Sequence, residues 1–166
     1  MNQSIAYQIS RYLNDAGFEL HCRQPSVQKV RAMISDDTVK GTPLALILGV
    51  DRDFGFTRPE ISQISDPFVV IVQLFHKPGT GAEALRALES MVETSRQDSG
   101  TLGFVLFPDS KDLDAVRFMG IYKSQEHYFN VHLKSKETEE FRVATNHIVV
   151  ERKAHFLKPI GGFLSK

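Results

Sequence analysis

The chain has 166 residues, with 20 Lys and Arg against 20 Asp and Glu, and a single cysteine. A balanced charge provides no basic surface to neutralise a phosphate backbone, so we expect no nucleic-acid partner. Cys22 has no second cysteine with which to form a disulfide or a Cys-x-x-Cys metal motif. The apolar runs are too short to span a membrane and no basic leader precedes them, so we expect a cytoplasmic protein that does not enter a membrane.

The first 50 residues have the pattern strand, helix, strand. Apolar residues alternate with polar or small ones at 5–10, as in a half-buried strand. Asn14 is a candidate helix cap before the helical residues 18–21, and a second helical run is expected at 26–34. A strand is expected at 44–50, because these residues are mostly apolar and β-prone.

Residues 51–67 are predicted to be a linker. Gly55, Pro59 and Pro67 interrupt any helical or strand periodicity there. This linker would separate residues 1–50 from a larger domain at 68–166.

The domain at 68–166 is expected to contain six elements in the order strand, helix, strand, strand, helix, strand. We place the first four at 68–75, 80–96, 102–107 and 116–122. The second helix opens at 129–132 and, after a polar stretch, has a second helical run at 137–144, and the last strand is at 148–156. The first strand is almost entirely apolar, as expected of a strand buried on both faces, and a capping box at 80–83 predicts the start of the first helix. Right-handed crossovers in this order give a four-stranded antiparallel sheet with both helices on one face, the ferredoxin-like βαββαβ fold of the α+β class.

An internal repeat relates the two parts of the chain. The alternating segment at 116–122, the candidate cap Ser124 and the helical residues 129–132 repeat the order seen at 5–21. The chain is therefore predicted to hold one and a half copies of one module, with residues 1–50 as an extra βαβ half-repeat. The apolar sheet face opposite the helices would need a cover, and a second copy of the chain would supply it in a homodimer.

Several short motifs follow one another in a distinctive order. They are Val69-Val70-Ile71-Val72, Lys77-Pro78-Gly79, Asp98-Ser99-Gly100, Phe104-Val105-Leu106-Phe107, Tyr122 and His132-Leu133-Lys134-Ser135. With these motifs, residues 68–156 resemble the antibiotic biosynthesis monooxygenase domain, and residues 1–50 resemble its second half. The resemblance implies a dimeric α+β barrel that holds an aromatic, quinol-like substrate, which members commonly oxidise with O2 without a metal or a flavin. Members also include isomerases and haem-degrading enzymes.

The sequence departs from this family in two places. Many members carry Glu and then Trp near the end of the third strand, where this chain has Gly120 and Tyr122 and no Trp anywhere. Haem-degrading relatives use a histidine beyond position 132, where residues 139–142 of this chain contain none. The six histidines also show no spacing typical of a metal site. We therefore expect no haem, metal or other cofactor.

His132 is the first candidate catalytic residue. An imidazole can accept a proton from a phenol or an activated C–H group, and Tyr128, one helical turn earlier, can donate a hydrogen bond to a developing oxyanion. The alternative is that His132 and Tyr128 are packing residues of a helix bend.

Six further residues are candidates for substrate binding. They are Gln73, His76, Phe104, Arg117, Tyr122 and Asn130. Gln73 and Arg117 are polar residues in apolar strands, so they either face solvent or bind a polar group of the substrate. His76 is interpreted as a rim residue rather than a base, since it adjoins a turn. Phe104 would supply a flat apolar wall.

These observations favour an enzyme. We expect a cofactor-independent monooxygenase that oxidises a polyketide-type aromatic, an anthrone or a hydroquinone, with O2 in secondary metabolism. A non-oxidative isomerase or cyclase that uses the same base, and an accessory protein that binds a similar ligand without turnover, remain the alternatives.

Overall fold

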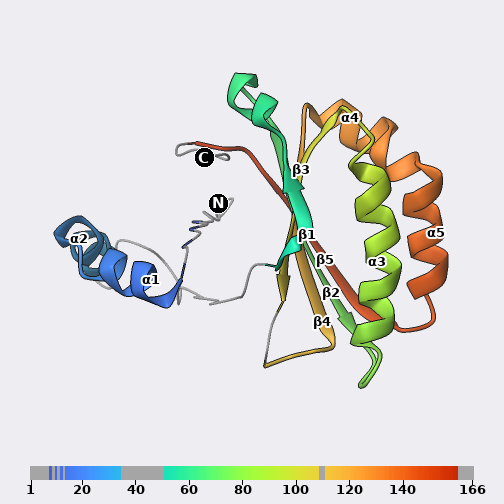
Figure 1. Ribbon diagram of the computed structural model, residues 1–166, viewed down its shortest axis with the longest axis horizontal. Helices are drawn as coiled ribbons and strands as arrows, with labels where there is room; N and C mark the ends of the chain where they lie inside the picture. The colour runs from blue at the N-terminus through green and yellow to red at the C-terminus, as the bar shows by residue number, and fades with distance from the viewer. Residues whose placement is uncertain are drawn as a thin grey trace, which may run out of the picture. The chain divides into compact units, whose positions relative to one another are not determined.

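The structure is a computed structural model that describes residues 8, 10, 12, 14–34, 51–108 and 111–160, with the side chains of 51–53 and 108 excepted (Figure 1). The chain separates into two compact units, unit 1 at 1–46 and unit 2 at 47–166.

Unit 1 contains two short helices, α1 (Asp15–Cys22) and α2 (Pro25–Met33). The side chain of Asn14 caps α1 by accepting a hydrogen bond of 2.9 Å from the Gly17 N–H, which satisfies one of the free donors at a helix start. Pro25 stands at the first position of α2, where its missing N–H costs nothing. Both helices were predicted from the sequence. The predicted strand at 44–50, and most of the one at 5–10, lie outside the described residues.

Unit 2 is a five-stranded antiparallel sheet with its α-helices on one face (Figure 1). The strands are β1 (Asp51–Thr57), β2 (Phe68–His76), β3 (Thr101–Pro108), β4 (Ala115–Tyr122) and β5 (Val149–Leu157), in the spatial order β1-β3-β4-β2-β5. The helices are α3 (Gly81–Ser95), α4 (Gln125–Asn130) and α5 (Lys136–Thr145), with the 3-10 turns η2 (Pro59–Gln63) and η3 (His132–Lys134). Strands β2 to β5 have the ferredoxin-like order, which confirms the predicted α+β fold.

The helix α3 forms where its apolar spacing predicts, but its start is capped differently. Its apolar stripe, with Leu88 fully buried, packs on the sheet. The expected capping box at 80–83 is absent, because the Thr80 hydroxyl donates to the Lys77 carbonyl instead. The carboxylate of Asp114, from the loop before β4, accepts from the N–H groups of Gly79 and Gly81 at 2.9 and 2.8 Å. The start of α3 is therefore capped by Asp114, which is distant in the sequence, and not by the adjacent Thr80.

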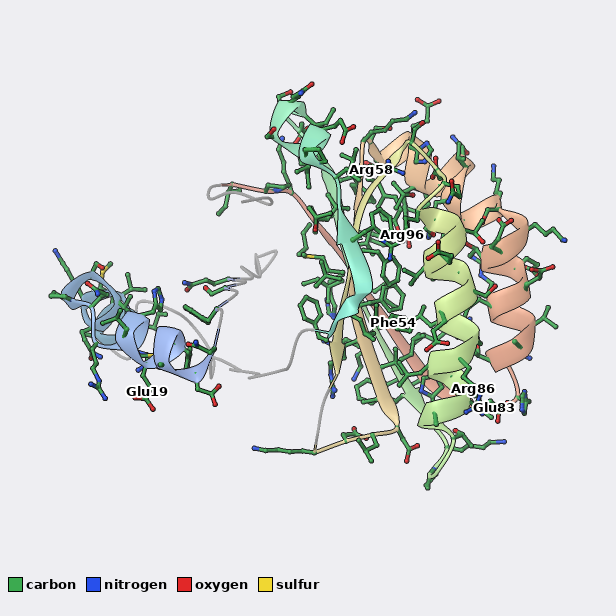
Figure 2. The ribbon with its side chains drawn as sticks, in the orientation of Figure 1. Glu19, Phe54, Arg58, Glu83, Arg86 and Arg96 are labelled. Atoms are coloured by element: carbon green, nitrogen blue, oxygen red, sulfur yellow. The ribbon has the colours of Figure 1, made fainter. Side chains whose placement is uncertain are left out.

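Residues 51–67, predicted to be a linker, form β1 and η2 instead. Strand β1 pairs with β3 at the edge of the sheet. Gly55 does not form a turn but allows β1 to lie close to β3, because a Cβ atom at this position would lie 2.6 Å from the Phe104 carbonyl oxygen. Arg58 and Arg96, labelled in Figure 2, fix the strand: Arg58 donates to the Thr101 carbonyl at 3.0 Å, and Arg96 donates to the Gly55 carbonyl at 3.3 Å.

The sheet carries a hydrophobic cluster on each face. On the helix side, Leu74 of β2 packs with Leu88 of α3 and Phe118 of β4. On the opposite side, Ile61 of η2 packs with a second cluster that includes Met119, and this cluster is buried within the single chain. The expectation that a second chain covers this face stays a prediction, since Ile71, Phe107 and Leu157 on the same face are only partly buried.

Candidate functional site

His132 lies where the chain turns from α4 into α5. Ser124 caps α4 by accepting from the His127 N–H at 3.1 Å. Helix α4 ends after six residues, and the short turn η3 then carries His132. The Thr138 hydroxyl donates to the His132 carbonyl at 2.8 Å and ties this turn to the start of α5. The ring of His132 is thereby directed inward, and the residue is only 7% exposed.

Three rings converge at this point on the helix side of the sheet. The ring centroid of His132 lies 4.8 Å from that of Tyr122 and 5.8 Å from that of Tyr128, on which it stacks at 21°. The two tyrosine rings are 4.9 Å apart. Val70 of β2 packs against both tyrosines and closes the cluster from the sheet. We call Tyr122, Tyr128 and His132 the inner cluster.

Gly120 explains how the ring of Tyr122 fits on the strand. Residues 120 and 122 project from the same face of β4, and a Cβ atom at Gly120 would lie 2.5 Å from the Tyr122 hydroxyl oxygen. The glycine therefore makes room for the tyrosine ring, which is 1% exposed. Many family members have Glu and Trp at these two positions. The two differences in this chain depend on each other, because Gly120 leaves the space that the Tyr122 ring occupies.

The inner cluster is electrically neutral at pH 7. Burial lowers the pKa of His132 to about 4; the negative charge of Asp98 opposes this shift, and the positive charge of Arg142 adds to it. Burial also raises the pKa of Tyr122, and that of Tyr128, although Arg142 lowers the pKa of Tyr128 in part. The site therefore offers an uncharged imidazole as a proton acceptor beside two phenol groups that keep their protons.

A buried histidine paired with a partly exposed carboxylate adjoins the inner cluster. Nε2 of His127 lies 2.7 Å from Oδ2 of Asp98, and the Asp98 carboxylate also accepts from the Gly100 N–H and the Thr101 hydroxyl. Burial raises the pKa of Asp98, but the hydrogen bonds from these three groups outweigh it, so the net pKa is lowered. A Cβ atom at Gly100 would clash with the His127 ring.

Sequence reasoning missed this pair because Asp98 and Gly100 were considered only as parts of a short motif between a helix and a strand. The spacing of a turn gives no indication that a distant helix will place a histidine against it.

Gln73 and Arg117 lie on the other face of the sheet, away from His132. They are opposite each other in the register of β2 and β4, and their neighbours on this face include Phe75 and Lys153. Arg117 is 8% exposed, with its guanidinium 5.6 Å from the centroid of the Phe75 ring, so the alternative that it faces solvent is wrong.

The remaining predicted binding residues are spread over the unit. His76, interpreted as a rim residue, is buried at the end of β2, with Nδ1 2.9 Å from the Asp114 carbonyl oxygen. Phe104 is fully buried and stacks on Phe118 in the core beneath α3. Asn130 is at the surface, where it accepts from the Lys134 ammonium group at 3.1 Å. Of the predicted binding residues, the structure brings only Tyr122 together with the catalytic candidates.

Neither a metal centre nor a membrane span is found in the part of the chain that the structure describes. There, no three His, Cys, Asp or Glu side chains are grouped so that they could hold a metal ion. No described helix is long and apolar enough to cross a membrane.

Comparison with known proteins gives a family match for part of the chain and a fold. Residues 67–144 match the model of the antibiotic biosynthesis monooxygenase family. No curated protein matches the chain. Among solved structures, a candidate monooxygenase from Fusobacterium nucleatum shares 19% identity over 89% of this chain and 65% of its own, with a TM-score of 0.70. A candidate monooxygenase from Lactobacillus acidophilus shares 13% identity over 87% of this chain and 66% of its own, with a TM-score of 0.68.

A shorter relative matches a smaller share of the chain. A candidate antibiotic biosynthesis monooxygenase from Bacteroides thetaiotaomicron shares 18% identity over 60% of this chain and 95% of its own, with a TM-score of 0.56. At these identities the likeness shows the fold. The chain spans just under two thirds of the length of the two longer relatives.

Proposed function

Residues 67–144 of this chain form an antibiotic biosynthesis monooxygenase domain, and from this premise we propose that the protein oxidises a polyketide-type aromatic, an anthrone or a hydroquinone, with O2. The observation that carries the proposal is the inner cluster. It holds an uncharged, buried imidazole against two aromatic rings.

The chemistry requires one base and a dry site. His132 removes a proton from the substrate, and the resulting carbanion or phenolate passes an electron to O2. For an anthrone, the superoxide and the substrate radical combine to a peroxide anion at the same carbon, and this anion takes the proton back from His132 to become a hydroperoxide. Loss of water from this hydroperoxide leaves a carbonyl group, so one oxygen atom enters the product and the other leaves as water.

The surroundings of His132 fit this sequence of charges. A pKa of about 4 keeps the imidazole unprotonated and ready to accept a proton at neutral pH. Once the proton has moved, the substrate anion lies beside the imidazolium ion and favours its charge, as does Asp98. The Tyr128 hydroxyl is protonated and can donate to the oxyanion of the substrate. The protein thus supplies a base and a donor on adjacent rings.

Two further parts of the proposal rest on the family. We propose that the reaction needs no metal or organic cofactor and that the protein is a homodimer. The second point has partial support from the sheet face opposite the helices, where Ile61 and Met119 are buried but Ile71, Phe107 and Leu157 remain partly exposed. Light scattering tests it, with a mass of about twice the 18.7 kDa of one chain expected.

Oxygen uptake tests the proposed reaction. Protein treated with EDTA and freed of flavin is mixed with 1,8-dihydroxyanthrone in an oxygen electrode, and anthraquinone formation is followed by absorbance. We expect one O2 consumed for each anthraquinone formed, above the rate without protein, and loss of this activity in His132→Gln. Conversion without O2 uptake would replace the proposal with an isomerase or cyclase. Binding without conversion would indicate an accessory protein.

A further inference from the structure

Three phenylalanine rings form a partly exposed patch beside the inner cluster. Phe68 is the first residue of β2, Phe129 belongs to α4, and Phe156 lies near the end of β5. Phe156 is 53% exposed and Phe129 is 36% exposed. These three residues, from three separate elements, are named the outer patch.

The rings of the outer patch contact one another in a closed set. The Phe68 and Phe156 rings stack at 18° with centroids 5.8 Å apart. Phe129 lies 6.1 Å from Phe68 and 5.6 Å from Phe156. These distances are in the range in which aromatic rings attract one another.

Tyr128 connects the outer patch to the inner cluster. Its ring centroid lies 5.5 Å from Phe68, 5.0 Å from Phe129 and 6.0 Å from Phe156. The same ring stacks on His132. A continuous series of ring contacts therefore runs from the partly exposed outer patch, across the buried Tyr128 ring, to the proposed base.

Packing alone does not account for the exposure of the outer patch. Single exposed apolar residues are common, but exposed rings gathered from distant parts of the sequence mark a binding surface. Three side chains offer far less area than the roughly 1,000 Å² that a stable protein interface needs. A small flat ligand matches the patch in size and in chemistry.

We propose that the outer patch is a second ring subsite of the candidate site, which stacks the distal ring of a fused polycyclic substrate while its reacting ring lies at Tyr128 and His132. This assignment rests on the proposed function for the position of the reacting ring. It adds a selection rule: the protein prefers fused tricyclic aromatics to single-ring hydroquinones, because only the larger ligand reaches both surfaces.

Equilibrium binding of two stable probes tests this subsite without turnover. Dissociation constants for 1,8-dihydroxyanthraquinone and for hydroquinone are measured by titration calorimetry under argon. We expect Phe156→Ala to weaken binding of the tricyclic probe by about 3- to 10-fold, the loss of one ring contact. It should change hydroquinone binding by less than about 2-fold. Phe156→Tyr keeps the ring and should restore the wild-type constants.

The control is Val150→Ala, which removes an apolar side chain that is 67% exposed on the same strand and should leave both constants unchanged. Equal losses for the two probes, no loss for either, or no binding of the tricyclic probe to the wild-type protein would overturn the subsite. Phe129→Ala repeats the test from α4 if Phe156→Ala is not folded.

The two proposals can fail separately. Selective tricyclic binding through Phe156 without any oxygen uptake would refute the reaction and leave the subsite. Oxygen uptake with an unchanged KM for the anthrone in Phe156→Ala would refute the subsite and leave the reaction.

Discussion

Each unit contains a tyrosine, a second aromatic ring and a histidine in contact. They are Tyr12, Phe18 and His21 in unit 1, and Tyr122, Tyr128 and His132 in unit 2. The tyrosine lies 5.0 Å from the histidine in unit 1 and 4.8 Å in unit 2, centroid to centroid. In both units a polar cap follows two residues after the tyrosine, Asn14 or Ser124. This likeness agrees with the predicted internal repeat.

The surroundings of the two clusters differ. None of the described residues of unit 1 is buried, whereas the inner cluster lies between a sheet and helices, with His132 at 7% exposure. Unit 1 also has Phe18 where unit 2 has Tyr128, so it lacks the hydroxyl donor. The same types of ring at a similar spacing are therefore not sufficient for a catalytic site. Burial away from water is what lowers the pKa of the imidazole.

The largest expected effect separates the two histidines in the anthrone oxidation assay. His132→Gln should lower turnover by about 10² to 10⁴, the usual contribution of a general base, since glutamine fills similar space but cannot take the proton. His21→Gln should leave turnover within about 2-fold, because unit 1 does not supply the base. Melting curves of both variants establish that they are folded. Equal losses of turnover in the two variants would mean that His21 of unit 1 is needed for the reaction as much as His132 of the inner cluster.

Acid should weaken the fold through His132. Its pKa is 6.5 in the unfolded chain and about 4 in the folded one, so between these values the unfolded chain binds more protons. The free energy of unfolding therefore falls as the pH falls through this window, by about 2 to 3 kcal/mol between pH 7.5 and 4.5. Urea unfolding at the two pH values measures the loss. His132→Gln should lose correspondingly less, and an identical loss in the variant would refute the assignment.

A pair of glycine substitutions compares the packing of the two units. Gly120→Ala should lower the free energy of unfolding by about 1 to 3 kcal/mol, because its Cβ atom overlaps the Tyr122 hydroxyl and the buried ring has little room to move. Gly17→Ala is the control in α1, where the new Cβ atom would lie 3.5 Å from Asn14 Oδ1, an ordinary contact. It should be neutral or raise stability by less than about 1 kcal/mol. A tolerated Gly120→Ala would contradict the coupling of positions 120 and 122.

The smallest effect concerns one hydroxyl group. Tyr128→Phe should lower anthrone turnover by about 10-fold with little change in melting temperature, since it removes a hydrogen-bond donor and keeps the ring. The reciprocal Phe18→Tyr change in unit 1 should give no gain. Turnover that is unaffected in Tyr128→Phe would restrict this residue to packing.

The sequence predicted the order of strands and helices at 68–157, because that order depends on periodicity along the chain. It also placed His132 beside Tyr128, although the helix expected to carry both residues ends at Asn130 and His132 lies in η3. Residues 51–67 were misassigned because glycine and proline are frequent in turns. The pairing of β1 with β3 is instead supported by hydrogen bonds between residues more than 40 positions apart, from Arg58 to the Thr101 carbonyl and from Arg96 to the Gly55 carbonyl. The exposure of Arg117 could not be predicted for a related reason. The alternation of apolar and polar residues assigns this residue to one face of a strand, but it does not indicate what covers that face.

The most direct test of the account is the protonation of His132 itself. Two-dimensional NMR of protein labelled with 13C and 15N at histidine follows all six imidazoles from pH 3.5 to 8, and the resonance missing from His132→Gln identifies the residue. The account predicts that this resonance titrates near pH 4, with the neutral imidazole present throughout the physiological range. Titration near 6.5, the value of an exposed histidine, would show that the inner cluster does not exclude water and would contradict the buried, water-free setting proposed for the base.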